Sequence, residues 1–390
     1  MKAKQFYAAA AGAAMALTLA ACSGGGAGSS SDDASASTDS SDTAASGETY
    51  RVGVAMPTQT SERWIADGEA VQSQLEELGY EVDLQFGNDD IPTQTQQIEQ
   101  MVTNGADLLI VAAIDGTALA SQLEAAAAEG IPVIAYDRLI NDTDAVDFYV
   151  TFDNYTVGVQ QATSLLVGLG ILNEDGSEGD ATGPFNIELF AGSPDDNNAT
   201  FFFNGAMDTL QPYIDNGTLV VASGQTDFNT VAITRWLQEK AQERMDNLLT
   251  STYTGDTKVD GVLSPYDGLS RGIITALQNN GYSGTTADGF PIVTGQDAEI
   301  ASVKLIADDV QFSTIFKDTR KLAAQAVTAA QSILSGEDPE ANDTETYDNG
   351  VKVVPSYLLE SDIIYADNIQ ELLVDSGYWT EEEVASGVAE

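Results

Sequence analysis

The sequence has 390 residues, with 15 lysine and arginine residues against 61 aspartate and glutamate residues, for a formal net charge of -46. This charge argues against binding to nucleic acid, whose phosphates would be repelled, and against adhesion to an anionic membrane through basic patches. The chain contains no histidine and one cysteine, which excludes Ser-His-Asp and Cys-His catalysis, the usual His/Cys zinc sites and a disulfide within one chain.

The N-terminal segment has the pattern of an export signal. Two lysines precede the short apolar run 8–21, which ends in Leu19-Ala20-Ala21-Cys22 and resembles a bacterial lipobox. We therefore expect a signal peptide at residues 1–21 and lipidation of Cys22, rather than an uncleaved anchor with an incidental cysteine. Residues 22–47 consist mainly of small and acidic residues, so we expect a disordered tether there.

From Tyr50 onward, short apolar runs alternate with longer segments of helical periodicity. The apolar runs predict strands at residues 50–56, 82–86, 108–113, 131–137, 148–152, 186–191, 219–223, 259–264, 291–295, 312–316 and 351–357. The periodic segments predict helices at residues 61–78, 92–104, 117–129, 156–168, 197–210, 231–249, 268–279, 298–307 and 319–334. Such alternation is typical of parallel sheets covered by helices on both faces, and one continuous sheet would be unusually wide. We therefore expect an α/β protein with two lobes of the same build facing each other across a cleft.

Polar and aromatic residues gather just after the predicted strands. Ligands bind at the carboxyl ends of strands in open α/β sheets, and the candidates there are Gln59, Arg63, Trp64, Asp137, Arg138, Asp195, Asp196, Asn197, Asn198, Asp267, Gln296, Asp297 and Lys317. Carboxylates, amides and guanidinium groups suit a ligand rich in hydroxyls, because each hydroxyl both donates and accepts hydrogen bonds. Trp64 and Trp236 are candidates to cover the apolar face of a sugar ring, with core packing as the alternative.

Three other interpretations are weaker. Asp137 followed by Arg138 could be a surface ion pair. Glycoside hydrolysis by Asp137, Asp267 and Asp297 would need two carboxyl groups in asymmetric environments, and the sequence gives no sign of these. The acidic loop 175–180 lacks the spacing of a calcium-binding EF-hand, so we expect a solvated loop and no metal site.

Several motifs, taken in order, resemble the type I periplasmic sugar-binding proteins of ABC importers, in the xylose-binding and ChvE-like branch. The motifs are Glu62-Arg63-Trp64, Ala135-Tyr136-Asp137-Arg138-Leu139-Ile140-Asn141-Asp142, Phe152-Asp153-Asn154, Gly192-Ser193-Pro194-Asp195-Asp196-Asn197-Asn198-Ala199, Arg244-Met245-Asp246-Asn247-Leu248-Leu249, Leu263-Ser264-Pro265-Tyr266-Asp267-Gly268 and Gly295-Gln296-Asp297-Ala298. The resemblance implies two Rossmann-like lobes joined by three crossovers. The first lobe would comprise residues 48–151 plus 317–354, and the second residues 152–316 plus 355–390.

The resemblance also assigns roles to residues of this chain. It implies that Arg63, Asp137 and Arg138 bind sugar hydroxyls from the first lobe, with Asn198, Asp267 and Asp297 opposite and Lys317 at a hinge. Trp64 and Trp236 would sandwich the sugar ring. Weaker candidates are Gln59, Asn154, Asn197, Tyr266 and Gln296, and Tyr266 stands where many relatives have asparagine.

The implied function is capture of a monosaccharide and its delivery to an ABC permease with a cytoplasmic ATPase. The expected protein is a monomer without enzymatic activity or cofactor, exported and lipid-anchored on the outer face of the cytoplasmic membrane. Related repressors carry an N-terminal helix-turn-helix, where this chain has the lipobox and tether. The alternatives are a receptor of the same fold for a furanose or a furan signal, a chemosensory sugar receptor and an exported glycosidase.

Overall fold

The structure is a computed structural model that describes residues 49–389. The expected signal peptide, the lipidation of Cys22 and the expected tether lie outside the described residues. In the part of the chain from Thr49 to Ala389, no helix combines the length and the apolar character needed to cross a membrane.

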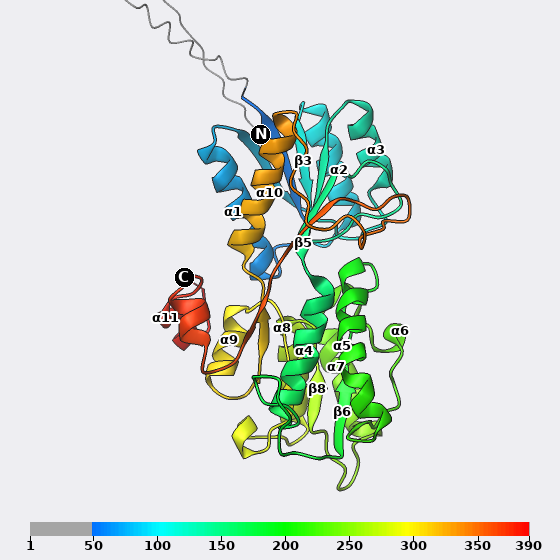
Figure 1. Cartoon of the computed structure of the whole chain (residues 1–390), viewed down its shortest axis with the longest axis vertical. Helices are drawn as coiled ribbons and strands as arrows, with labels where there is room; N and C mark the ends of the chain where they lie inside the picture. Colours follow the sequence, from blue (N-terminus) through cyan, green and yellow to red (C-terminus); the bar gives the residue numbers. More distant parts are fainter. Residues whose placement is uncertain (1–48, 390) are drawn as a thin grey trace, which may run out of the picture. The chain divides into compact units, whose positions relative to one another are not determined.

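The first sheet has six parallel strands in the order β11-β5-β4-β3-β1-β2. Figure 1 labels β3 and β5 of this sheet, together with the helices α1, α2, α3 and α10 of the same lobe. Its strands are β1 (Arg51–Met56), β2 (Glu81–Phe86), β3 (Leu108–Val111), β4 (Val133–Tyr136), β5 (Phe148–Phe152) and β11 (Ser356–Leu359). Helices α1 (Glu62–Glu77) and α10 (Thr319–Leu334) cover one face, and α2 (Ile91–Thr103) and α3 (Ala120–Ala128) cover the other. Alternate residues of β1 divide between the two cores, with Val54 on the α1 side and Ala55 on the α2 side.

The second sheet has four parallel strands in the order β7-β6-β8-β9. These are β6 (Phe185–Leu189), β7 (Leu219–Val221), β8 (Gly261–Leu263) and β9 (Ile292–Val293). Helices α4 (Asn154–Gly168) and α5 (Asn197–Asp215) pack on one face, and α7 (Gln238–Ser251) and α8 (Asp267–Asn279) pack on the other. The fold class predicted from the sequence, two α/β lobes with parallel sheets, is confirmed.

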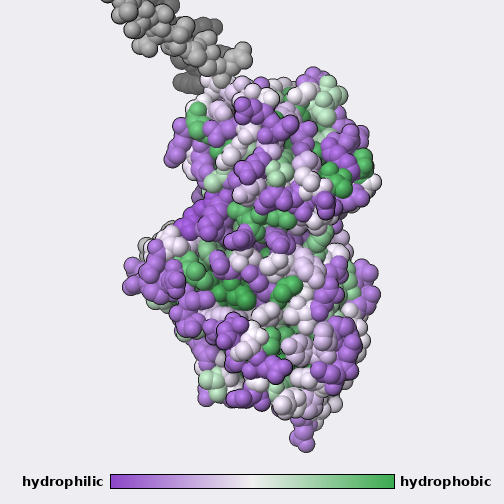
Figure 2. All heavy atoms as spheres, in the orientation of Figure 1, coloured by the Kyte–Doolittle hydropathy of each residue, from purple (hydrophilic) through white to green (hydrophobic). Residues whose placement is uncertain are grey.

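Smaller elements complete the second lobe. They are α6 (Phe228–Val231), η1 (Thr234–Trp236), η2 (Thr286–Asp288), α9 (Ile300–Ala307), β10 (Thr314–Phe316), β12 (Asp362–Ile364), η3 (Gln370–Val374) and α11 (Glu381–Ser386). β10 and β12 pair in the antiparallel sense. The face of the molecule in Figure 2 is mostly hydrophilic with smaller hydrophobic patches, as expected for a chain with so many carboxylates.

Two expectations about local structure were wrong. The strand expected at residues 351–357 is β11, which begins at Ser356 and pairs in parallel with β5. Ser356–Leu359 therefore belongs to the first sheet, and the expected return to the second lobe at residue 355 is too early. The helix expected at residues 231–249 is broken, because Arg235 (φ 59) and Trp236 (φ 55) adopt left-handed backbone conformations between α6 and α7. An apolar spacing alone does not reveal such a turn.

Candidate ligand-binding site

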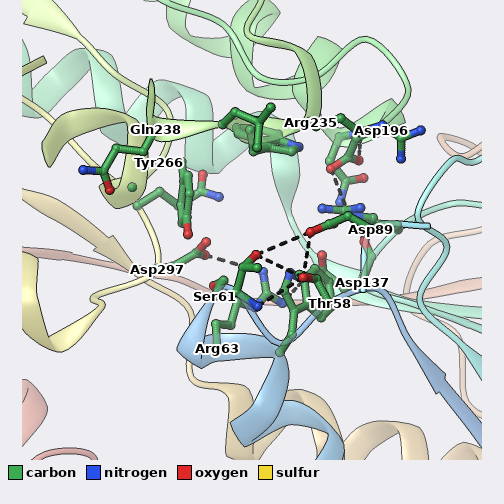
Figure 3. Close-up of a pocket in the computed structure, with 18 of the residues that line it drawn as sticks. Thr58, Ser61, Arg63, Asp89, Asp137, Asp196, Arg235, Gln238, Tyr266 and Asp297 are labelled. Carbon is green, nitrogen blue, oxygen red and sulfur yellow. Dashed lines mark hydrogen bonds and ion pairs between the residues drawn. The ribbon is translucent and has the colours of Figure 1, made fainter. Parts of the chain in front are cut away.

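A cavity of about 360 Å³ lies where the carboxyl ends of the two sheets face each other. This volume is within the range of small-molecule sites, roughly 300–1,000 Å³. Figure 3 shows the labelled residues on both sides of the cavity, with Arg63, Ser61, Thr58 and Asp137 on one side and Arg235, Gln238 and Tyr266 on the other. The lining is rich in charge, with Arg63, Arg138, Arg235, Arg271 and Lys317 as cations and Asp89, Asp137, Asp196, Glu239 and Asp297 as anions.

Arg63 lies at the centre of the charged residues that line the cavity. It lies in the first turn of α1 and is 6% exposed. Its guanidinium forms ion pairs with Asp137 of the first lobe, with Asp297 of the second lobe (Nη1 to Oδ1, 3.5 Å), and with Asp67 one helical turn away (Nε to Oδ2, 3.0 Å). These three carboxylates outweigh the cost of burial and raise the pKa of Arg63 well above its ordinary value. Arg63 therefore stays charged and joins the two lobes.

Asp137 directly follows β4 and has a left-handed backbone conformation (φ 60). Burial tends to raise the pKa of its carboxyl, but Arg63 and then Lys317 outweigh this effect and hold the pKa below its ordinary value. Its backbone carbonyl accepts hydrogen bonds from the Tyr149 hydroxyl (2.6 Å), the Thr151 hydroxyl (2.9 Å) and the Asn198 side-chain amide (2.7 Å). Because Asn198 lies in the first turn of α5 in the second lobe, this carbonyl also connects the lobes.

Asp297 faces Asp137 from the loop after β9. Its Oδ1 atom accepts both Lys317 Nζ (3.0 Å) and Arg63 Nη1 (3.5 Å). Lys317 is 2% exposed, and its ammonium lies over the rings of Phe152 and Phe202 at 5.7 and 5.5 Å. A carboxylate shared by two buried cations is held in place by both of them.

Arg138 lies between an aromatic ring and a carboxylate. Its guanidinium carbon is 5.0 Å from the centre of the Trp64 ring, and its Nε atom is 3.2 Å from Asp196 Oδ2. Its Nη1 donates to the carbonyl of Ala113 at 3.1 Å. Burial raises the pKa of Asp196, and Arg138 opposes this effect. Asp196 is also the N-cap of α5, where it accepts the backbone N–H of Asn198.

Trp236 owes its position to the broken helix. Its ring packs edge-on against Phe202 and Tyr266, with ring centres 6.4 and 6.0 Å apart. Gly192 makes room for it, because a Cβ atom at that position would overlap the Trp236 ring. The indole Nε1 is buried and has no hydrogen-bond acceptor among residues 49–389.

A second set of contacts between the lobes surrounds Glu299, which is 4% exposed. Its carboxylate accepts the hydroxyls of Ser61 (2.6 Å) and Tyr266 (2.8 Å) and pairs with Arg271 (2.6 Å). Ser61 precedes α1, the helix that carries Arg63 and Trp64. The Tyr266 hydroxyl is therefore already engaged within the protein, and Tyr266 lines the cavity with a ring whose hydroxyl is bound elsewhere.

Most of the residues singled out from the sequence meet at this cavity. The lining includes Arg63, Trp64, Asp137, Arg138, Asn198, Trp236, Asp297 and Lys317, together with Tyr266 and Gln296 from the weaker candidates. Asp196, which the sequence places after the strand expected at residues 186–191, also lines the cavity. Sequence reasoning did not identify Thr58, Thr60, Ser61, Asp89, Phe202, Arg235, Leu237, Gln238, Glu239, Gly268 and Arg271.

Four expected site residues do not line the cavity. Asp267 is fully buried and directed away from it, since its carboxylate accepts the backbone N–H of Glu299 (2.9 Å) and the side-chain amide of Gln311 (2.9 Å). Burial and then the charge of Glu299 raise the pKa of Asp267 well above its ordinary value. Asn154 donates to Thr151 and Tyr347 within the core. Gln59 is exposed, and Asn197 is one residue before the lining residue Asn198.

Within residues 49–389, no group of His, Cys, Asp and Glu side chains could hold a metal ion. In the acidic loop, Asp175 instead accepts the backbone N–H (2.9 Å) and the hydroxyl (2.5 Å) of Ser177. This arrangement fits a solvated turn.

The chain is similar to known binding proteins over most of its length. It is 55% identical over 341 residues to the multiple sugar-binding periplasmic receptor ChvE of Rhizobium radiobacter, covering 87% of this chain and 94% of that protein. It is 35% identical over 344 residues to the D-xylose-binding periplasmic protein of Escherichia coli (strain K12), covering 88% and 95%. A solved ABC transporter solute-binding protein from Clostridium phytofermentans with bound beta-D-glucose matches with a TM-score of 0.79 and 48% identity, covering 86% of this chain and 99% of that chain.

The family assignment follows from the same findings. Residues 52–338 match the model of the periplasmic binding protein domain. The relatives are binding proteins, which confirms the prediction of a receptor rather than an enzyme. The chain belongs to the periplasmic binding protein domain family, in which its relatives include sugar-binding receptors of ABC importers.

Proposed function

We propose that the chain captures a monosaccharide in the cavity between its lobes and delivers it to an ABC sugar permease. The observation that carries the proposal is the balance of the lining, with five cationic and five anionic side chains. A neutral ligand keeps this balance of charge and leaves the ion pairs of Arg63, Arg138 and Lys317 intact, whereas a highly charged ligand would leave a surplus of one sign. Hydroxyl groups are neutral and can bond to carboxylates and guanidinium groups alike.

The aromatic residues support a ring-shaped ligand. Trp64 lies on the first-lobe side and Trp236, Phe202 and Tyr266 on the second-lobe side. The apolar C–H face of a pyranose fits against such rings, while the hydroxyls at its edge reach Arg63, Asp137 and Asp297. In this proposal Trp64 and Trp236 cover the two faces of the ring.

Closure of the lobes would complete the site. Arg63 of the first lobe contacts Asp297 of the second, and Asn198 of the second lobe contacts Asp137 of the first. A sugar bound to one lobe can also contact residues of the other lobe when the two lobes lie close together. Sugar binding therefore favours the conformation in which the lobes are closed around it. The permease would then recognise surfaces of both lobes in that arrangement.

We also propose that Cys22 is lipidated after cleavage and that the tether holds a monomeric receptor at the outer face of the cytoplasmic membrane. The support is the sequence Leu19-Ala20-Ala21-Cys22 and the chain's single cysteine. Mass spectrometry of protein extracted from the membrane fraction should show an acylated cysteine at the N-terminus. An N-terminus at Met1, or an unmodified Cys22, would contradict the lipid anchor.

A thermal-shift and tryptophan-fluorescence screen tests sugar capture. The panel contains D-glucose, D-xylose, D-galactose, D-fructose, a galactofuranoside and myo-inositol. At 100 times its dissociation constant a ligand stabilises the folded protein by about 2.7 kcal/mol, which gives a measurable rise in melting temperature. A pyranose that raises the melting temperature and changes the emission supports the proposal. A response confined to the furanoside, or none across the panel, would contradict it.

A further inference from the structure

Asp67 lies one helical turn beyond Arg63 on α1 and is fully buried. It is not among the residues that line the cavity. One of its carboxylate oxygens accepts Arg63 Nε at 3.0 Å, and the other accepts the hydroxyl of Tyr136. The charge of Asp67 is therefore placed behind Arg63, on the side away from the ligand space.

These contacts form a closed ring. Tyr136 ends β4 and Asp137 follows it, so the two residues that bond to Asp67 and Arg63 are consecutive in the chain. Consecutive strand residues normally point to opposite faces of a sheet. The left-handed conformation of Asp137 (φ 60) ends the strand, and both side chains reach α1.

The ring limits the freedom of the Arg63 guanidinium. A guanidinium has five N–H donors in a rigid plane. Asp67 takes the Nε donor, Asp137 takes one on Nη2 and Asp297 takes one on Nη1, so two of the five donors are left for a ligand. With Nε held from behind, the plane cannot rotate freely, and the direction of the two remaining donors is set.

We propose that Asp67 is a positioning residue that fixes which sugar hydroxyls Arg63 recognises, and that the Tyr136 hydroxyl in turn holds Asp67. The inference rests on the proposed sugar-binding function and extends it to residues that never touch the ligand. It also assigns hydroxyl selectivity to a group outside the cavity.

The electrostatics of Asp67 agree with this role. Burial raises its pKa to about 6, with Arg63 opposing the rise and the charge of Asp137 adding to it. The carboxyl is therefore ionised at neutral pH, where it is a stronger acceptor for Arg63 Nε than a neutral group would be.

The test compares Asp67→Ala, Asp67→Asn and Tyr136→Phe with the wild-type protein at pH 7.5. Calorimetric affinities are measured for D-glucose, D-xylose and the monodeoxy derivatives of each. For the hydroxyls that Arg63 binds, the wild-type protein should prefer the parent sugar over the deoxy sugar by about 10- to 100-fold. In Asp67→Ala this preference should shrink to about threefold or less at those positions and stay unchanged at the others.

Asp67→Asn and Tyr136→Phe should reduce the preference for the parent sugar less than Asp67→Ala does. Asp67→Asn keeps an oxygen that can accept Arg63 Nε, so it should retain more of the preference than Asp67→Ala. Tyr136→Phe removes one hydroxyl from a buried ring and should give an intermediate loss. If Asp67→Ala does not fold, the preference between parent and deoxy sugars is measured on Tyr136→Phe instead.

Glu188→Gln is the matched control. Glu188 is another fully buried carboxylate that accepts a tyrosine hydroxyl, that of Tyr253 at 2.7 Å, but it lies on β6 and does not line the cavity. This variant should be less stable and keep every preference between parent and deoxy sugars.

The outcomes separate this inference from the proposed function. If the wild-type protein binds neither parent sugar, the proposed function fails and this inference fails with it. If the wild-type protein discriminates but the Asp67 and Tyr136 variants weaken all sugars by one common factor, the role of Asp67 is structural and only this inference is overturned.

Discussion

Replacement of Asp297 by asparagine should weaken sugar binding and destabilise the protein together. Asp297 Oδ1 accepts Lys317 Nζ at 3.0 Å and Arg63 Nη1 at 3.5 Å. Asparagine tolerates the left-handed backbone of this position (φ 92) nearly as well as aspartate, so the loop should keep its path. The main change is the loss of one negative charge between two buried cations.

The size of both effects depends on the ion pairs that remain in the Asp297→Asn variant. Arg63 still has Asp67 and Asp137, whereas Lys317 loses the one carboxylate with which it forms an ion pair within residues 49–389. Breaking a buried ion pair typically costs about 3–5 kcal/mol. Because the asparagine oxygen still accepts a hydrogen bond, we expect a loss near 3 kcal/mol in the free energy of unfolding. A charge-assisted hydrogen bond to the ligand contributes about 1.5–3 kcal/mol, so sugar affinity should fall by about 10- to 100-fold.

Urea denaturation and calorimetric titration measure the two quantities. Adding Lys317→Met to Asp297→Asn separates them, since the methionine side chain suits the space beside Phe152 and Phe202 that the lysine stem occupies. The double variant should recover most of the stability but not the affinity. An Asp297→Asn protein that binds sugar within about threefold of wild type would refute the reasoning.

Three further outcomes are expected. Trp236→Ala should reduce affinity by about 0.5–1.5 kcal/mol beyond the loss of packing, and wild-type affinity of this variant by fluorescence titration would contradict stacking by Trp236. Gly192→Ala should displace the Trp236 ring and weaken binding in a folded protein, as judged by circular dichroism and titration, and wild-type affinity would count against this placement. The pKa of Asp67 is raised from 3.8 to about 6 in the folded protein. Between about pH 4 and pH 7 the folded state therefore binds more protons than the unfolded state, and the free energy of unfolding should fall as the pH rises through this range. Measured by urea denaturation, the free energy of unfolding of the wild-type protein should fall by about 2–3 kcal/mol more than that of Asp67→Asn over this pH range. Parallel pH profiles of the two proteins would argue against a raised pKa of Asp67.

The sequence predicted the position of site residues correctly where these residues follow the strands of a regular parallel sheet. Parallel strands bring their carboxyl ends to one edge, and this rule placed Asp137 and Asp297 at the cavity although they are far apart in the chain. The same rule failed for Asp267. It begins α8 after β8, as expected, but position after a strand does not determine the direction of a side chain, and this carboxylate turns toward Glu299 and Gln311.

Some of the remaining site residues, such as Phe202 and Arg271, lie on helices that the sequence predicted, whereas others lie on segments whose path no periodicity describes. Asp89, in the loop between β2 and α2, and Arg235, in the short turn η1, each adopt a left-handed backbone conformation, and their position at the cavity depends on the folded chain around them. Glu299 was not identified because its role depends on Ser61 from the opposite lobe. The bond between Asp67 and Tyr136 likewise joins two elements that are distant in the sequence. Contacts of this kind require the three-dimensional structure.

A crystal structure of the protein grown with D-glucose or D-xylose tests the central claim most directly. We expect density for one sugar ring between Trp64 and Trp236, with its hydroxyls within hydrogen-bonding distance of Arg63, Asp137 and Asp297. A sugar bound outside this cavity, or one inside it whose hydroxyls contact none of these three residues, would contradict the account.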